Sequence, residues 1–269
     1  MGQSVIIVTG WQPAVPKSED DMPQGLTDIH CHILPYVDDG SDDEDETRDL
    51  IAMQSRQGVD RIIITPHLRE GMFETPQRQV DMEFDRLREY IHTIPLGPHV
   101  YAGRENHCDH LFLHELRRGR AVTLARSDYI LIEFARHSRE RIFKYTREVL
   151  EQGLIPVIAH VERYPAVWAE PELTGELTAA GARLQMNCES VMGLMGRRLQ
   201  DLSMRLLEDD VISFIASDAH HRDYRVPDLG ICADRLFRIL PRDQFERIFY
   251  RNPEQIFESR SRRLRHHPV

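Results

Sequence analysis

No apolar run in this sequence approaches the roughly 20 residues that a helix needs to cross a bilayer. The apolar stretch nearest the start, SVIIVTGW at residues 4–11, is short, lacks a basic flank and shows no small-residue cleavage site. It is therefore not typical of a signal peptide. These absences predict a protein that does not insert into a membrane.

Cysteine is scarce as well. The four cysteines, Cys31, Cys108, Cys188 and Cys232, lie far apart and form no Cys-x-x-Cys pair. Such spacing is typical of reduced thiols rather than of a disulfide framework. We therefore expect a cytoplasmic protein.

Basic residues are in deficit, with 34 Lys and Arg against 44 Asp and Glu and a formal net charge of −10. An excess of negative charge repels phosphate-rich surfaces, so nucleic acid is not an expected partner. The middle of the chain also lacks a Gly-, Ser- or Pro-rich linker, and 269 residues suit one large α/β domain. We predict a single domain.

Short β-branched runs alternate with longer amphipathic segments along the chain. The runs that predict strands are 26–30, 61–67, 99–105, 129–134, 155–160, 183–189 and 211–220. The segments that predict helices are 43–58, 76–91, 110–119, 139–153, a stretch ending near Gly181, 197–210, 227–240 and a final helical pair. About seven strand–helix units of this kind predict an α/β fold with parallel strands and crossover helices.

Metal-type ligands end six of these predicted strands. They are His30 and His32, His67, Glu105, Glu133, His160, and Asp218 with His220. In a barrel of parallel strands all these ends lie on one face. Residues two apart in an extended segment point to the same side, so His30 and His32 can reach one cation while Cys31 points away and packs.

The ligand types and their number define the kind of site. Mixed imidazole and carboxylate ligands suit manganese, iron or zinc, and the set is too large for one ion. A cluster of two or three ions fits better, and such clusters serve in-line displacement at phosphorus. The acidic residues Asp38 and Asp39 follow the first ligands, and their spacing does not decide which of them binds metal.

Three arginines follow the predicted ligands at the same end of the strands. Arg163 comes shortly after His160, Arg225 after His220, and Arg69 after His67. An arginine fork matches two phosphate oxygens, which a lysine does not. The sequence therefore favours a phosphate-bearing substrate held by Arg69, Arg163 and Arg225.

Together these motifs resemble the polymerase-and-histidinol-phosphatase (PHP) family, and within it the bacterial capsule- and exopolysaccharide-locus tyrosine-protein phosphatases. The motifs are DIHCHILPYVDDG (28–40), TPH (65–67), GMFETP (71–76), GRE (103–105), LIEF (131–134), PVIAHVERY (156–164) and ASDAH (216–220). The resemblance implies a distorted (β/α)7 TIM-like barrel over residues 26–258. Residues 1–25 are then an extension of uncertain structure, and 259–269 a basic, solvated tail.

The resemblance also implies residue roles. His30, His32, Glu133 and Asp218 match the ligands of one metal, with Glu133 as the bridge. Asp39, His67, Glu105, His160 and His220 complete a cluster of up to three ions, commonly manganese. Arg163 and Arg225 match positions that grip phosphate, and His220 or His67 could protonate the leaving group.

The implied activity is hydrolysis of phosphotyrosine by a metal-activated hydroxide. The implied substrate is a phosphotyrosine protein, namely an autophosphorylated tyrosine kinase that controls polysaccharide export. A histidinol-phosphate-type small-molecule phosphatase, a nuclease and a non-catalytic metal-binding regulator of polysaccharide assembly are the alternatives. A cysteine-dependent phosphatase is not favoured: CADRLFR (232–238) fits Cys-x5-Arg, but it contains no glycine and places Cys232 at helical spacing with Leu236 and Ile239.

Overall fold

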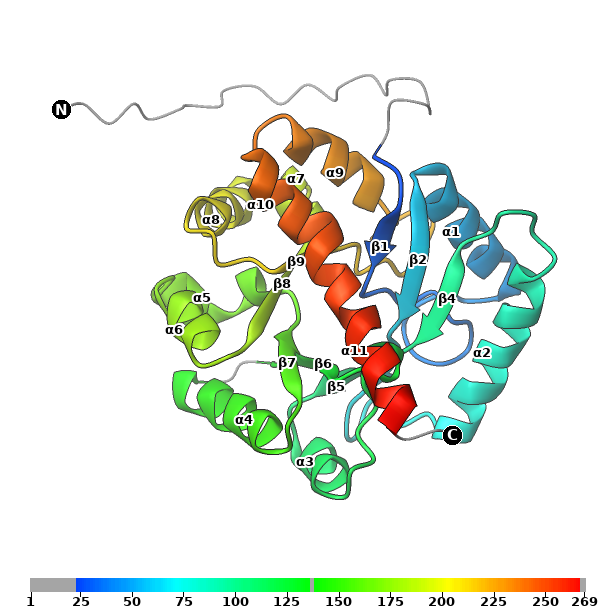
Figure 1. Cartoon of the computed structure of the whole chain (residues 1–269), viewed down its shortest axis with the longest axis horizontal. Coiled ribbons are helices and arrows are strands. Elements are labelled where there is room, and N and C mark those ends of the chain that lie inside the picture. The colour runs from blue at the N-terminus through cyan, green and yellow to red at the C-terminus, as the bar shows by residue number, and fades with distance from the viewer. Residues whose placement is uncertain (1–22, 136–137, 267–269) are drawn as a thin grey trace.

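The computed structural model describes residues 23–135 and 138–266, and in it parallel strands are surrounded by helices (Figure 1). The strands are β1 (Leu26–Asp28), β2 (Val59–Ile64), β3 (His67–Leu68), β4 (His99–Ala102), β5 (Glu105–His107), β6 (Tyr129–Glu133), β7 (Ile155–Ile158), β8 (Arg183–Asn187) and β9 (Phe214–Ala216). The α-helices are α1 (Glu44–Arg56), α2 (Gln77–Ile91), α3 (His110–Arg117), α4 (Arg139–Glu151), α5 (Pro165–Ala169), α6 (Leu173–Ala179), α7 (Cys188–Met192), α8 (Arg197–Glu208), α9 (Leu229–Phe237), α10 (Arg242–Glu246) and α11 (Asn252–His266). Shorter helical segments are η2 (Leu124–Arg126), η3 (Val161–Arg163) and the π-helical η4 (Arg247–Arg251).

Two of the predicted strands are each split in the structure. The segment 61–67 forms β2 and β3, and 99–105 forms β4 and the start of β5. The first break lies at Thr65 and Pro66, where proline has no N–H to donate to a strand ladder. The strands therefore form two sheets, in the orders β1-β2-β4 and β3-β5-β6-β7-β8-β9. Because β2 and β3 share one position, and β4 and β5 another, the nine strands of the described residues fill seven positions around a ring.

The ring closes between the first and last strands. Cys31 and Ala219 form a parallel bridge, and the His32 N–H donates to the Ala219 carbonyl at 2.7 Å. Below this bridge the buried Asp28 accepts hydrogen bonds from the backbone and hydroxyl of Ser217, at 3.1 and 2.5 Å. All the strand pairings are parallel. The predicted distorted, seven-position parallel barrel is confirmed.

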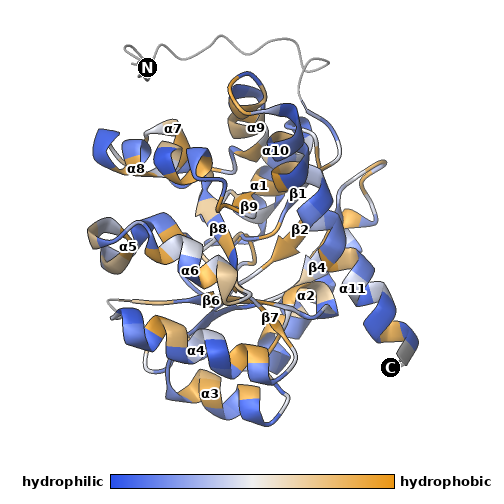
Figure 2. Ribbon diagram, turned by 60° about the vertical axis from the view of Figure 1, so that its left-hand side comes forward, coloured by the Kyte–Doolittle hydropathy of each residue, from blue (hydrophilic) through white to orange (hydrophobic). Residues whose placement is uncertain are grey.

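Side chains alternate along each strand between the inside and the outside of the barrel. Leu131, Val157 and Ala216 belong to an apolar cluster inside the ring, whereas Ile130 and Ile132 belong to the cluster that packs beneath the outer helices. The next inward position after Leu131 on β6 is Glu133. Figure 2 shows the matching pattern on the outer helices, where hydrophilic and hydrophobic residues alternate. Apolar packing thus fills the lower barrel and leaves polar side chains at its carboxyl end.

The acidic run SDDEDET begins a helix, as its charge pattern predicts. The Asp43 side chain caps α1 by accepting from the Glu46 N–H at 2.8 Å, and Glu44, Asp45 and Glu46 lie in its first turn. The cap fixes where the loop carrying Asp39 ends.

The structure describes residues 259–266 of the predicted tail as the end of helix α11, with residues 260–265 exposed or half-buried. Helix α11 continues to His266 and crosses the end of the barrel where the strands begin (Figure 1, red). Ser259 is fully buried and its hydroxyl donates to Asp128 at 2.7 Å, just before β6. Phe257 stacks near Tyr101 of β4, with ring centroids 4.8 Å apart. The apolar positions of this helix close the lower barrel, although its composition is basic.

The other boundary predictions concern the ends of the chain. Residues 1–22 of the predicted extension, and 267–269 of the tail, lie outside the described residues. The division at 25 and 258 stays a prediction. Among the helices in 23–135 and 138–266, none combines the length and the apolarity needed to cross a membrane.

Asp228, just before α9, gives a prediction for pH-dependent stability. Its side chain is buried, its Oδ1 has no hydrogen-bond partner in the described structure, and burial raises its pKa to about 7. The unfolded chain loses this proton near the ordinary value of 3.8, so between about pH 4 and pH 7 this carboxyl increasingly disfavours folding. We expect Asp228→Asn to match wild type near pH 4 and to be more stable at pH 8, by up to about 4 kcal/mol.

Urea unfolding at pH 5 and pH 8 measures this difference. The exposed Asp60→Asn, on β2, is the matched control and should show no such pH-dependent gain. An Asp228→Asn protein that is no more stable than wild type at pH 8 would show that the carboxyl is solvated or paired.

Candidate metal centre

The structure places all nine predicted ligands at the carboxyl end of the barrel. His30 and His32 follow β1, His160 follows β7, and Asp218 and His220 follow β9. The remaining four come from the β1 loop, β3, β5 and β6: Asp39, His67, Glu105 and Glu133. Cys31 is fully buried between the two histidines and its Sγ lies 3.7 Å from the Ile63 carbonyl oxygen, so it packs as predicted.

Glu105 lies at the centre of the group. Its Oε2 is 3.3 Å from His30 Nε2, 3.2 Å from His32 Nε2 and 3.0 Å from His67 Nδ1. Its Oε1 is 2.9 Å from His160 Nε2. Glu105 therefore contacts four of the predicted ligands, and the assignment of Glu133 as the bridging ligand, which the sequence resemblance implied, stays a prediction.

Glu133 approaches two of the same ligands as Glu105 and lies away from His30 and His32. Its carboxylate oxygens lie 3.5 Å from His67 Nδ1 and 3.8 Å from His160 Nε2. The buried His107 also approaches it, with Nδ1 3.2 Å from Glu133 Oε1. His107 was not among the predicted site residues, although it lies two positions after Glu105 on the same strand and so points to the same side.

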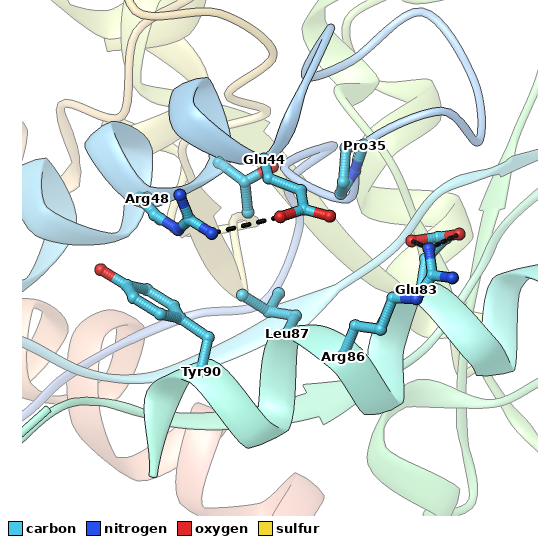
Figure 3. Close-up of a pocket in the computed structure, with 8 residues that line it drawn as sticks. Pro35, Glu44, Arg48, Glu83, Arg86, Leu87 and Tyr90 are labelled. Atoms are coloured by element: carbon cyan, nitrogen blue, oxygen red, sulfur yellow. Dashed lines mark hydrogen bonds and ion pairs between the residues drawn. The ribbon is translucent and has the colours of Figure 1, made fainter. Parts of the chain in front are cut away.

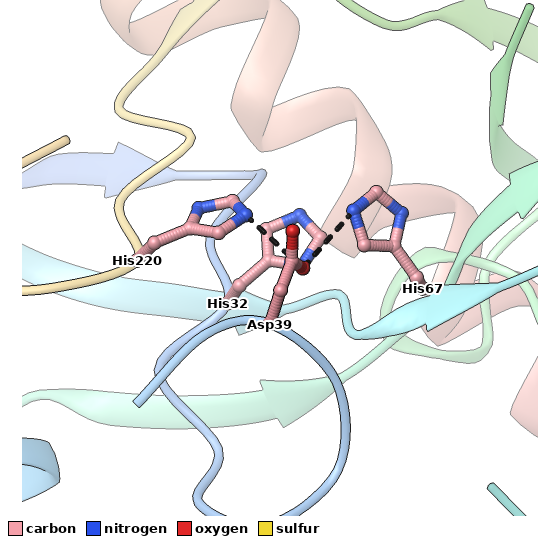
Figure 4. A group of neighbouring side chains, drawn as sticks. All are labelled: His32, Asp39, His67 and His220. Carbon is pink, nitrogen blue, oxygen red and sulfur yellow. Dashed lines mark ion pairs between the residues drawn. The ribbon is translucent and has the colours of Figure 1, made fainter. Parts of the chain in front are cut away.

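The outermost group contains His32, Asp39, His67 and His220, whose ligand atoms lie within 4.8 Å of one another (Figure 4). Asp39 Oδ1 is 3.5 Å from both His67 Nε2 and His220 Nε2. The Asp39 side chain is 48% exposed, whereas those of His32 and His220 are buried. This group therefore faces the solvent opening of the site.

These donors fit a cluster of divalent ions. Three groups of side chains could each hold an ion: His32, Asp39, His67 and His220; His30, His32 and Glu105; and His67, Glu105 and Glu133. Each pair of groups has one residue in common, which is His32, His67 or Glu105. Five buried nitrogen and oxygen atoms of the predicted ligands have no hydrogen-bond partner among the described residues: His67 Nδ1, Glu105 Oε2, His160 Nδ1, Asp218 Oδ1 and His220 Nε2. Buried carboxylates and unpartnered donors at such density are costly unless cations bind them.

The pKa shifts show that the site attracts positive charge. Burial alone would lower the pKa of His30, but the carboxylates of Glu105 and Asp218 raise it to about 9. Burial would raise the pKa of Glu105 and of Asp218, but in each case neighbouring cationic groups, His30 first among them, hold the pKa well below its ordinary range. The field that favours an imidazolium at His30 also favours a metal ion there.

Three site residues have left-handed backbone conformations, with φ of 32° at His160, 53° at Asp218 and 50° at Arg225. Such angles cost non-glycine residues about 1 kcal/mol or more each and concentrate at functional sites. At His160 and Asp218 the chain turns sharply out of its strand, which directs each side chain over the barrel mouth.

A layer of hydrogen bonds behind the ligands fixes their orientation. Asp38 accepts from His32 Nδ1 at 2.7 Å and from the His67 backbone N–H at 2.8 Å. The buried Arg104 donates to the His67 carbonyl at 2.8 Å. Asp38 thus supports two ligands, while Asp39 faces the opening.

The strand without a predicted ligand, β8, supplies most of this supporting layer. Gln185 Oε1 lies 3.1 Å from His30 Nδ1 and accepts from the His160 N–H at 2.8 Å. Asn187 Nδ2 donates to Asp218 Oδ2 at 2.6 Å. Sequence reasoning missed these residues and Glu189, which follows the strand. Polar residues at every second position of an otherwise apolar strand were the available signal.

The arginines lie beside Asp218. Arg225 Nη2 donates to Asp218 Oδ2 at 2.6 Å, and Arg163 Nη1 donates to the same oxygen at 3.3 Å. Arg163 also donates to the buried Glu189. Arg69 lies differently: its backbone pairs with Phe73, and no ion pair within the described residues ties its half-buried side chain to the cluster.

A small cavity of about 70 Å³ between α1 and α2 shares none of these residues (Figure 3). Pro35, Leu87 and Tyr90 line it, and Glu44 pairs with Arg48 at its edge, with Oε2 and Nη2 3.1 Å apart. Its small volume and its lining do not indicate a catalytic site.

Comparison with known proteins agrees with this geometry. The family described as capsular polysaccharide synthesis, CpsB/CapC, matches residues 26–258. This chain belongs to the CpsB/CapC family. It is 34% identical over 200 residues to the tyrosine-protein phosphatase YwqE of Bacillus subtilis, covering 73% of this chain and 78% of the relative. It is 33% identical over 237 residues to the tyrosine-protein phosphatase CpsB of Streptococcus pneumoniae, covering 86% and 98%.

A solved structure supports the same assignment. It comes from work on YwqE of Bacillus subtilis and CpsB of Streptococcus pneumoniae, described as unique metal-dependent tyrosine phosphatases. It matches this member of the CpsB/CapC family with a TM-score of 0.77 and 30% identity, over 91% of this chain and 96% of that one. A phosphotriesterase homology protein of Escherichia coli, at 13% identity and a TM-score of 0.56, shares the fold, covering 87% of this chain and 99% of that one.

Proposed function

We propose that this protein is a metal-dependent tyrosine-protein phosphatase of capsular polysaccharide synthesis. The observation that carries the proposal is the arrangement around Asp218. Its Oδ1 lies 3.4 Å from His30 Nε2, within the ligand cluster, and its Oδ2 accepts from Arg163 and Arg225. One carboxylate thus contacts both the candidate ligand cluster and two guanidinium groups, which supports a site where metal ions and arginines would act together on a phosphate ester.

In the proposed mechanism the chain holds and orients the phosphate group. His30, His32, Asp39, His67, Glu105, Glu133, His160, Asp218 and His220 hold the metal cluster. When bound, the ions supply Lewis acidity and lower the pKa of a water molecule toward neutrality. Arg163 and Arg225 stabilise the negative charge that develops on the phosphoryl oxygens. Arg69 enters from the β3 loop as a third substrate contact.

Protonation of the leaving group matters less to this reaction than binding of the phosphoryl group, because a phenolate leaves more readily than an alkoxide. Burial lowers the pKa of His220 to about 4, with a further contribution from His32. A histidine that is neutral at pH 7 suits a ligand better than an acid, so we assign His220 to the metal rather than to proton donation.

We further propose two or three manganese ions as the cofactor and a bacterial tyrosine kinase of polysaccharide export as the substrate. Mixed imidazole and carboxylate donors support manganese, with iron or zinc as competitors. The four cysteines are free and buried, which supports action in the reducing cytoplasm.

The test compares a phosphotyrosine peptide with histidinol phosphate, using metal-stripped protein with and without added manganese. We expect manganese-dependent turnover that favours the peptide. Preference for histidinol phosphate would transfer the protein to the small-molecule branch. Turnover of neither substrate by metal-loaded protein would favour a nuclease or the non-catalytic regulator.

Cys232→Ser is the control for cysteine chemistry. Cys232 lies fully buried on α9, so its thiol cannot reach a substrate. The folded variant should keep wild-type turnover, and loss of turnover would favour a thiolate nucleophile.

A further inference from the structure

Three large apolar side chains project into solvent from the loops beside the metal centre. Tyr36 is 54% exposed, Met72 59% and Tyr224 61%. They belong to the loops that follow β1, β3 and β9. Each lies close in sequence to a site residue: Tyr36 shortly before Asp39, Met72 between Arg69 and Phe73, and Tyr224 directly before Arg225.

The three loops are joined to one another. Thr75 Oγ1 donates to the Val37 carbonyl at 2.5 Å, and Gln79 Nε2 donates to the Tyr36 carbonyl at 3.3 Å, so the β3 loop and the start of α2 hold the β1 loop. On the other side His221 Nε2 lies 3.1 Å from the Asp39 carbonyl oxygen, which connects the β9 loop. We call Tyr36, Met72 and Tyr224 the apolar arc.

Contacts beneath the apolar arc tie it to the ligands. Phe73, next to Met72, stacks on the ligand His67 with ring centroids 4.9 Å apart and planes at 10°. Tyr224 stacks on His221 at 4.3 Å and 29°. The arc is therefore supported from below by rings packed on the metal centre and its neighbours.

The backbone of Tyr36 has a strained conformation. Its φ is 63°, in the left-handed region that bulky residues rarely adopt. The chain thus accepts backbone strain to place an aromatic ring in solvent rather than in the core. These three exposed apolar side chains lie on joined loops that also carry Arg69 and Arg225. Exposed apolar side chains beside a candidate site are typical of a binding surface.

We propose that the apolar arc binds the residues on either side of the phosphotyrosine in a protein substrate, and that it selects substrates whose flanking side chains are apolar. This inference rests on the proposed tyrosine-phosphatase function. With the phosphate held by Arg163 and Arg225, the flanking residues lie over the loops that carry the arc. A small phosphomonoester does not contact the apolar arc and gains no binding energy from it.

Two phosphotyrosine peptides of equal length and charge test this, one with leucine and one with serine on both sides of the phosphotyrosine. We expect wild type to prefer the leucine peptide by about tenfold in kcat/KM. The double variant Tyr36→Ala/Met72→Ala and the single variant Tyr224→Ala should each reduce that preference to about twofold or less. Hydrolysis of p-nitrophenyl phosphate, which has no flanking residues, should stay within about twofold of wild type.

Matched controls come from exposed apolar residues on outer helices. Met82 on α2 is 46% exposed and Phe237 at the end of α9 is 47% exposed. Met82→Ala and Phe237→Ala should keep the full peptide preference.

Several outcomes would overturn the inference, and each is distinct from failure of the proposed function. Arc variants that keep the tenfold preference, or a wild type without one, would overturn it while phosphotyrosine turnover still stands. Variants that change only the sedimentation behaviour of the protein would show that the arc joins two copies of the chain. Lack of any phosphotyrosine hydrolysis by wild type would overturn the function and the inference together.

Discussion

Replacing Glu105 by Gln is expected to lower kcat/KM for a phosphotyrosine peptide by about a thousandfold or more. Glu105 is fully buried, and its carboxylate lies within 3.3 Å of nitrogen atoms of His30, His32 and His67. Glutamine keeps the shape of the side chain but removes the charge that is shared among the ions. Steady-state kinetics and the metal content per chain, measured after dialysis, test both consequences.

Glu133→Gln is the matched comparison, because Glu133 contacts only one side of the cluster. We expect Glu133→Gln to retain more metal and more activity than Glu105→Gln. The reverse order would support Glu133 as the bridge, as the sequence resemblance implied. Circular dichroism of both variants must match wild type, so that lost activity reports on the site and not on unfolding.

Much of the candidate metal centre could be predicted from sequence because its ligands lie at or just after the ends of strands that can be recognised from local sequence. The β-branched runs identify the strands, and parallel strands place their carboxyl ends together. A His-x-His pair after such a run needs no tertiary information to be noticed. The family resemblance then favoured Asp39 over Asp38 as a ligand, and in the structure Asp38 accepts hydrogen bonds from His32 and His67.

The parts that could not be predicted depend on contacts between distant segments. Gln185 supports His30 from 155 positions away, and nothing local to either residue indicates the pairing. The contacts of Glu105 depend on the register of β5 with β6, in which Glu105 pairs with Leu131 and His107 with Glu133, and no local pattern indicates this register. The helical course of residues 259–266 was not predicted because this segment is basic, and the apolar residues of α11 that face the barrel, Ile256 and Phe257, lie before it.

Asp218 lies between the candidate metal ligands and the two arginines. Its Oδ1 faces His30 and His32, and its Oδ2 pairs with both arginines. If the cluster binds cations, Asp218 would share its negative charge between them and the guanidinium groups. Glu189, which also pairs with Arg163, would then help to hold that side chain in place.

Replacing Arg163 by Ala should lower kcat/KM for the peptide by about a hundredfold to a thousandfold while leaving metal content unchanged. The guanidinium donates to Asp218 and Glu189 and has an unpartnered Nε among the described residues, so it has capacity for phosphate oxygens. Arg163→Lys should recover little of the activity, because an ammonium group cannot present the planar fork.

Glu189→Gln should produce a smaller loss, about tenfold, since it affects the reaction through the orientation of Arg163. The double variant Arg163→Ala/Glu189→Gln separates this role from a direct one. If Glu189 acts only by positioning Arg163, the double variant is no slower than Arg163→Ala alone, because the positioned group is already absent. Losses in kcat/KM that multiply in the double variant would show instead that Glu189 contacts the substrate independently. Metal content equal to wild type in all three proteins would exclude an effect through the ions.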